Sequence, residues 1–236
     1  GIIAASGVIN GIAPKVNMVV VKAISAEGSG SDSDVADGIH FCADSGANVI
    51  CLSLGGRARF LNLGDQSANA CEDVIDEGVF VVAAAGNDGE SDDGDVSSPA
   101  TVNEVIAVGA IDKNKNIASF SSIGDNDGNV FPFRLPRFDP NRKPELVAPG
   151  IEITSTYLED GYAIVNGTSQ ATAFVAGGIV LLLDAHPDYM NGDSDEIIQF
   201  KNVFMDTAEK CPGQNTPHDN YYGYGLINVV DAHNDL

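Results

Sequence analysis

The chain has 236 residues, of which 44% are hydrophobic and 7% aromatic, and it contains no Trp. This composition is typical of a globular protein with one large or two small domains, and it excludes a disordered chain, a fibre or a repeat array. The 34 acidic residues outnumber the 12 basic ones and give a formal net charge of −22, so we expect no binding to nucleic acid or to anionic lipid surfaces. Such an acidic surface fits a halophilic or calcium-rich setting.

The termini and the cysteines give further limits. The chain has no start Met and no basic stretch before an apolar leader, so we interpret it as a processed or truncated piece of a longer protein. The longest apolar stretch, Ala171–Leu183, is too short to span a bilayer. Four scattered cysteines, Cys42, Cys51, Cys71 and Cys211, form neither a disulfide framework nor a zinc motif. Their oxidation state stays open, and a Cys42–Cys71 bridge is one alternative.

Short β-branched runs alternate with helical stretches, which predicts βα units and a mostly parallel sheet. The expected strands are Val16–Ala23, Ala47–Leu54, Gly78–Ala84, Glu104–Ala110 and Glu145–Ala148. The expected helices are Ser31–Asp44, Gln66–Glu77, Ser169–Ala185, Asp195–Ala208 and Leu226–His233. The helix Ser169–Ala185 is apolar on nearly all sides and should be central and buried.

The composition changes between Ser122 and Lys143, where Gly, Asp, Asn, Pro and Arg predominate. Because strand-like sequence resumes at Glu145, we interpret residues 122–143 as a surface insertion and not as a linker. Residues 1–236 then form a single domain.

The strongest functional signal is the segment Asn166–Thr172, Asn-Gly-Thr-Ser-Gln-Ala-Thr, which opens the buried helix. A turn of small residues places the Ser169 hydroxyl at a helix N-terminus, where free N–H groups and the helix dipole favour negative charge. This environment suits a nucleophilic serine beside a developing oxyanion. An ordinary N-cap serine is the alternative interpretation.

Three further signals lie at the ends of expected strands. The buried run from Val81 ends in Ala84, Ala85, Gly86, Asn87 and Asp88, and the Asn87 amide is placed to donate to an oxyanion. A turn asparagine is the alternative. The stretches Ser53-Leu54-Gly55 and Gly28-Ser29-Gly30 present small residues along which an extended peptide could pair.

Taken in this order, these four segments resemble those of the subtilisin-like serine proteases. The resemblance covers essentially the whole chain and includes shorter matches at Gly11–Pro14, Val105–Ala110, Phe120–Ser122, Ala148–Gly150 and Tyr224–Asn228. It implies a three-layer α/β/α fold with a mostly parallel sheet. It also implies a secreted serine endopeptidase that is extracellular or at the cell surface. The expected partners are a peptide or protein substrate and, as an open alternative, a separate N-terminal fragment or propeptide.

The resemblance implies a role for each matching residue. Ser169 is the expected nucleophile, and Asn87 with the Ser169 backbone N–H forms the expected oxyanion hole. The expected substrate-binding residues are Gly28, Ser29, Gly30, Ser53, Leu54, Gly55, Ala84, Ala85, Gly86 and Ser97. Asp88 at the pocket rim favours a basic or polar group, and the Ser98–Pro99 bond is expected to be cis.

The chain departs from the family pattern in its first residues and in three internal places. The family's general base is the first His of a His-Gly-Thr-His-Val-Ala-Gly segment, and Gly1 matches the final Gly of that segment. We therefore expect the base His and its Asp upstream of Gly1, on a separate fragment or on a longer form of the chain. We expect the 236-residue chain alone to be nearly inert. Gln170 stands where the family usually has Met, and Ala173-Phe174 where it has Pro-His. The insertion 122–143 is longer than in the family's minimal form.

The expected cofactor requirement is none for the chemistry. Asp125-Asn126-Asp127-Gly128 is similar to the start of a calcium loop, but no bidentate Glu follows at the required spacing, so a structural calcium ion stays an open alternative. The competing function is a non-catalytic subtilisin-like module that binds peptides or a partner. A dinucleotide-binding enzyme is set aside because Gly28-x-Gly30 has no third glycine.

Overall fold

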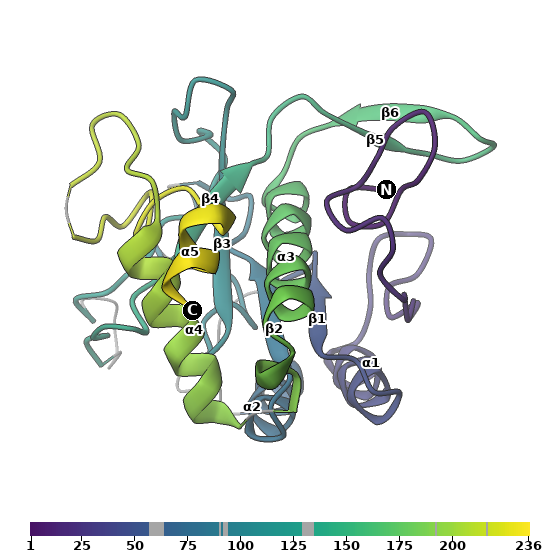
Figure 1. The fold of residues 1–236 in the computed structure, drawn as a ribbon, viewed down its shortest axis with the longest axis horizontal. Helices are drawn as coiled ribbons and strands as arrows, with labels where there is room; N and C mark the ends of the chain where they lie inside the picture. The colour runs from purple at the N-terminus through teal and green to yellow at the C-terminus, as the bar shows by residue number, and fades with distance from the viewer. Residues whose placement is uncertain (57–63, 90, 92–93, 129–134, 192, 216) are drawn as a thin grey trace.

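A computed structural model describes residues 1–56, 64–89, 91, 94–128, 135–191, 193–215 and 217–236. Its core is a sheet of four parallel strands in the order β1-β2-β3-β4, namely β1 (Val49–Leu52), β2 (Phe80–Ala84), β3 (Ile106–Ile111) and β4 (Leu146–Pro149). The helices α1 (Asp32–Asp44) and α2 (Gln66–Asp76) pack on one face, and α3 (Thr168–Ala185) lies across the other (Figure 1). The predicted three-layer α/β/α architecture is confirmed.

Burial explains why these strands lie at the centre. All five residues of β2 and all six of β3 are buried, because each strand has a neighbour on both sides and helices above and below it. Helix α3 contacts all four strands. By length and composition α3 could cross a bilayer, but 61% of it is buried inside the domain, as befits a core helix. The expectation that α3 is central is confirmed.

The remaining elements lie at the periphery. A hairpin of β5 (Ile153–Thr156) and β6 (Tyr162–Val165) extends above the N-terminal segment (Figure 1). The 3-10 helix η2 (Pro187–Asn191) follows α3, and then come α4 (Ser194–Thr207) and α5 (Val229–Asp235). The sequence did not predict the hairpin, whose strands alternate between half-buried and exposed residues.

The predicted strand Val16–Ala23 is wrong for the described structure. The segment runs without turns but belongs to no sheet, and within the described residues the N–H groups of residues 17–23 donate to no backbone acceptor. Val20 is 83% exposed and Met18 52%, although both side chains are apolar. The β-branched run has strand propensity, but no described strand lies beside it to complete a ladder.

The described part of the 122–143 segment is anchored to the domain. Arg137 donates from both terminal nitrogens to the buried Asp95 carboxylate, at 2.7 and 3.0 Å. Asn126 is buried and both donates to and accepts from the Lys143 backbone, whereas Leu135 and Phe138 are exposed. Residues 129–134 lie outside the described residues, so the surface insertion stays a prediction.

A buried ion network joins β4 to α4. Glu145 Oε1 accepts from Lys143 Nζ and from Lys201 Nζ, each at 2.8 Å, and all three side chains are at most 3% exposed. Burial lowers the pKa of Lys143 to about 7, while Glu145 opposes that shift and Lys201 adds to it. The second Glu145 oxygen accepts from the Ala107 N–H of β3 at 2.8 Å. One carboxylate therefore holds two ammonium groups and a strand in place.

We expect Glu145→Gln to destabilise the protein by about 3–5 kcal/mol, because it removes the carboxylate that offsets the cost of burying the Lys201 and Lys143 side chains. Urea unfolding of the wild type and of the variant measures the difference. The matched control is Glu159→Gln, at an exposed carboxylate in the hairpin turn, which should change stability by less than about 0.5 kcal/mol. Equal stabilities of the two variants would contradict a structural role for the network.

Candidate active site

The candidate site lies where two strands end and one helix begins. Ser53 follows the last residue of β1, Asn87 comes three residues after the end of β2, and Ser169 is the second residue of α3. In a parallel sheet the carboxyl ends of neighbouring strands share one edge, and the N-terminus of α3 reaches that edge. The fold therefore brings together three segments that are far apart in sequence.

Ser169 and Ser53 hold each other through two hydrogen bonds. The Ser169 Oγ donates to the Ser53 carbonyl at 3.0 Å, and the Ser53 Oγ donates to the Ser169 carbonyl at 2.9 Å. Ser169 is half-buried and lines a cleft, so its hydroxyl is both positioned and accessible. The Ser169 N–H is one of the first four of α3, which have no acceptor within the helix.

Asn87 is fixed through its oxygen by Thr168. The Asn87 Oδ1 accepts from the Thr168 N–H at 2.9 Å and from the Thr168 Oγ1 at 3.0 Å. A Cβ on Gly167 would lie 2.8 Å from the Gln170 Oε1 but 3.5 Å from the Asn87 Nδ2, so this glycine makes room for the Gln170 side chain. The oxygen is thus occupied on the helix side, and the Nδ2 remains as a donor beside the start of α3. Asn87 and Ser169 are brought to the same helix terminus, as expected.

Thr168 was missed by the sequence analysis. Its hydroxyl donates to Asn87 and also accepts from the Gly86 N–H at 3.3 Å, so it links the end of β2 to α3. Thr168 is fully buried. A threonine immediately before a candidate nucleophile was the available signal, but a hydroxyl at a helix start is more often read as a cap.

Small residues surround Gly86. Gly86 has a φ of +114°, and a Cβ there would collide with the hydroxyls of Ser97 and Ser122. Ser97 N–H donates to the Ala85 carbonyl at 2.7 Å, and Gly55 approaches the Ser97 side chain from β1. Gly55, Ala85, Gly86 and Ser97 are therefore neighbours, and Ser122 joins them without having been predicted. The predicted cis bond at Ser98–Pro99 is confirmed.

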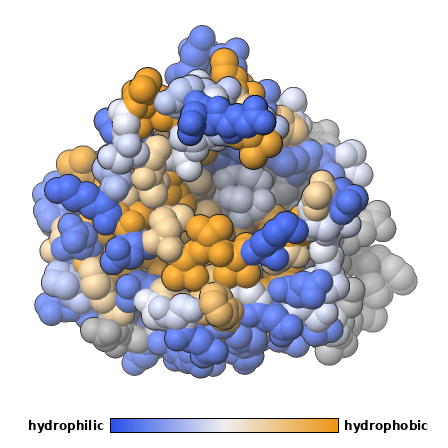
Figure 2. All heavy atoms as spheres, turned by 90° about the vertical axis from the view of Figure 1, so that its right-hand side faces the viewer, coloured by the Kyte–Doolittle hydropathy of each residue, from blue (hydrophilic) through white to orange (hydrophobic). Residues whose placement is uncertain are grey.

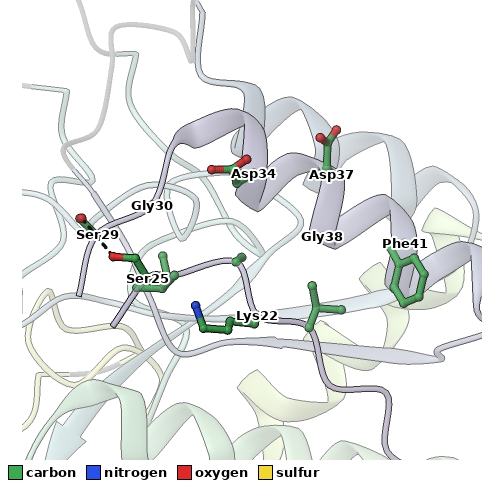
Figure 3. Close-up of a pocket in the computed structure, with 11 residues that line it drawn as sticks. Lys22, Ser25, Ser29, Gly30, Asp34, Asp37, Gly38 and Phe41 are labelled. Carbon is green, nitrogen blue, oxygen red and sulfur yellow. Dashed lines mark hydrogen bonds between the residues drawn. The ribbon is translucent and has the colours of Figure 1, made fainter. Parts of the chain in front are cut away.

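The other predicted substrate residues divide between two hollows. Ser53 and Leu54 line the same cleft as Ser169, and Ala84 is buried at the end of β2. Ser29 and Gly30 instead line a separate open pocket between the segment before α1 and α1 itself (Figure 3). Gly28 is exposed in the turn that leads there, and its N–H donates to the Ser25 carbonyl.

The cleft beside Ser169 is large and mostly apolar. It has a volume of about 930 Å³ and runs between the free edge of β1 and residues 15–21. Figure 2 shows apolar side chains gathered around the hollow on this face of the molecule. Within the described residues β1 pairs only with β2, so its other edge offers unpaired backbone groups to the cleft.

The four histidines make their contacts elsewhere. His40 lies 3.7 Å from Asp73 between α1 and α2, and His186 and His233 contact each other. His218 is buried against the Pro144 carbonyl and Tyr224, and burial lowers its pKa. None of the four histidines lines the cleft beside Ser169.

The described residues contain no group of three or more His, Cys, Asp or Glu side chains arranged for a metal ion. In the segment that is similar to a calcium loop, Asp125 donates its N–H to Asp95, and its carbonyl accepts from Arg137. The Arg137 guanidinium thus provides the positive charge at this place. All four cysteines are free thiols.

Comparison with known proteins places the chain in a family. Residues 1–225 match the Subtilase family. Subtilisin DY from Bacillus licheniformis is 36% identical over 223 residues, which cover 94% of this chain and 70% of the relative. The thermophilic serine proteinase from Bacillus sp. (strain AK1) is 37% identical over 224 residues, covering 95% of this chain and 47% of the relative.

A solved structure gives the same answer for the fold. The structure of the prenylagaramide maturation protease PagA superimposes with a TM-score of 0.77 at 26% identity and covers 96% of this chain and 76% of that one. The architecture, the ordered motifs and the sequence matches agree, and the chain belongs to the subtilase family of serine proteases.

Proposed function

We propose that the chain is the part of a serine endopeptidase that carries the nucleophile and the oxyanion hole. The observation that supports this function best is that Thr168 holds the Asn87 amide at the N-terminus of α3, immediately before Ser169, whose hydroxyl is bonded to the Ser53 carbonyl. In this proposal the Ser169 oxygen attacks the carbonyl carbon of a peptide bond and gives its proton to a general base. The amine leaves with that proton, and water then hydrolyses the acyl-enzyme.

Two donors would stabilise the charge that develops on the carbonyl oxygen. The Asn87 Nδ2 and the Ser169 N–H are the donors proposed, because both are left without a described acceptor at the start of α3. The helix dipole adds favourable potential at the same point. Thr168 is a positioning residue in this scheme, since it holds the Asn87 amide in one orientation.

The substrate is proposed to be an extended peptide. Ser53, Leu54 and Gly55 continue the free edge of β1 beside the nucleophile and would pair with its backbone. Ala84, Ala85, Gly86 and Ser97 would outline the pocket for the residue before the cleaved bond. Gly28-Ser29-Gly30 would flank the peptide on its second side, and Asp88 would favour a basic or polar group.

The general base is proposed to come from sequence upstream of Gly1, either on a separate fragment or on the same longer chain. The cleft between β1 and residues 15–21 supports this proposal, because Ser169 is one of the residues that line it. One wall is the unpaired edge of β1, and the other is the extended segment 17–21, whose N–H groups donate to no backbone acceptor within the described residues. A further strand seated there would pair on both sides and could present a base to the Ser169 hydroxyl.

The outer side of residues 21–25 is open as well, towards the pocket in Figure 3. The extended segment therefore has room for a neighbour on either side. We propose that in the whole protein it is an internal strand of a wider sheet.

We also propose that the protein is located outside the cell or at the cell surface.

In the whole protein we expect a fluorophosphonate probe to label Ser169, and Ser169→Ala to abolish both labelling and peptide hydrolysis. The loss in turnover should be on the order of a million-fold, a figure measured in subtilisin itself. Mass spectrometry of the labelled peptide identifies the residue. The matched control is Ser194→Ala at the start of α4, which does not line the cleft and should keep labelling unchanged. A folded whole protein that neither reacts with the probe nor cleaves peptides would instead be the non-catalytic binding module.

We expect Asn87→Ala to lower kcat by about 10²–10³-fold with little change in KM, because the lost donor acts on the transition state and not on the bound peptide. That magnitude is the one known for an oxyanion-hole asparagine in subtilisin. Steady-state kinetics on a peptide amide measures both constants. Asn69→Ala, at an exposed asparagine of α2, is the control and should leave both constants unchanged. A rise in KM at constant kcat would remove Asn87 from this role.

We expect the amides of residues 17–23 to exchange slowly with deuterium in the whole protein, because strand pairing would protect them on both sides. Hydrogen-exchange mass spectrometry compares them with β2, which is fully paired, and with the exposed turn 25–29. Exchange as fast as in the turn would show that no strand occupies the cleft. The probe reaction at Ser169 is independent of this result.

A further inference from the structure

Two of the four histidines meet at the end of α3 that lies away from Ser169. The His186 Nε2 and the His233 Nδ1 are 2.8 Å apart, and the ring centroids are separated by 4.8 Å at an interplanar angle of 57°. His186 is half-buried and His233 is exposed. Two imidazole nitrogens therefore face each other at the surface.

Helix packing brings these side chains together. His186 is the C-cap residue of α3, with its N–H bonded to the Leu182 carbonyl, and His233 lies in the last turn of α5. The two helices approach closely at Gly178, where a Cβ would come within 2.9 Å of a Val229 methyl group. Ala232, the residue before His233, is fully buried. The pair is thus held by two packed helices and not by a loop.

The surroundings favour a cation. Both histidines lie at the C-terminal ends of helices, where the unpaired carbonyl groups carry partial negative charge. An aspartate stands two positions before and two positions after each histidine, at Asp184, Asp188, Asp231 and Asp235. Neither 179–200 nor 226–236 contains a Lys or an Arg. Within the described residues no third His, Cys, Asp or Glu side chain forms a cluster with this pair, so the two imidazoles are the protein ligands available here.

We propose that His186 and His233 bind one divalent transition-metal ion, with Cu²⁺ as the preferred ion and water in the remaining positions. Imidazole nitrogens are suitable ligands for Cu²⁺, Ni²⁺ and Zn²⁺, and for a given set of nitrogen ligands the Irving–Williams order gives Cu²⁺ the highest affinity. The 2.8 Å separation of the two nitrogens is that of a hydrogen bond, and it places both of them within reach of one ion.

Binding requires a change of tautomer and a small rotation of the rings. In the neutral pair one imidazole donates its N–H to the other. When the metal enters, that imidazole carries its proton on its other ring nitrogen, and the two facing nitrogens both become ligands. The ion would tie α5 to α3. Ser169 lies at the opposite end of α3, about 25 Å away along the helix, so peptide hydrolysis should be unaffected.

The test uses the whole protein titrated with Cu²⁺ in a non-coordinating buffer, followed by calorimetry, electron paramagnetic resonance and thermal unfolding. We expect one bound ion whose spectrum shows hyperfine coupling to two imidazole nitrogens, together with a rise in Tm. His186→Gln and His233→Gln should each weaken binding by at least about tenfold and remove the Tm shift. His40→Gln, at an exposed histidine of α1, is the matched control and should bind as the wild type does.

Two results would overturn the site. Cu²⁺ affinity that is unchanged in the double variant would place the ion elsewhere. A wild-type spectrum with hyperfine coupling to fewer than two imidazoles would also exclude binding by this pair. That result needs no variant, so the test does not depend on how well the variants fold.

Discussion

The depth at which α3 is buried in the domain determines the geometry of the candidate site. A helix with eleven buried residues, in contact with all four strands, can neither slide nor rotate without opening the core. Its first turn is thereby fixed against the ends of β1 and β2, where the small side chains of Ser53 and Gly86 permit close approach. The Ser169 and Asn87 positions depend on this packing more than on any local feature of their own loops.

The strands with neighbours on both sides could be predicted from sequence, because burial on both faces requires apolar residues at successive positions. Phe80–Ala84 and Ile106–Ile111 contain no charged side chain, and such a run is best explained by a covered parallel strand. The same reasoning identified α3, whose apolar residues occupy nearly every side. The ordered motifs led to the prediction of Ser169 and Asn87 as site residues, and the structure places both near the N-terminus of α3.

Features that depend on pairing between distant residues could not be predicted. Val16–Ala23 has the composition of a strand, but a strand requires neighbours that composition does not specify. Glu145 binds both Lys143 and Lys201, and Lys201 lies 56 positions later in the chain. No local sequence pattern predicts that contact. Thr168 was overlooked for a related reason, since its role becomes visible only when Asn87, 81 positions earlier, lies beside it.

The hydrogen bonds of Ser169 also bear on where the base must stand. Its hydroxyl proton points to the Ser53 carbonyl, which can accept a hydrogen bond but cannot take the proton away. An acylation step therefore needs a base that reaches the Ser169 oxygen from a side that the β1 backbone does not occupy. The cleft between β1 and residues 15–21 is such a side, because β1 has an unpaired edge there and the N–H groups of the extended segment 17–21 have no backbone acceptor within the described residues. The proposed strand would thus meet two separate requirements at once, since it would complete the sheet and bring a proton acceptor to the nucleophile.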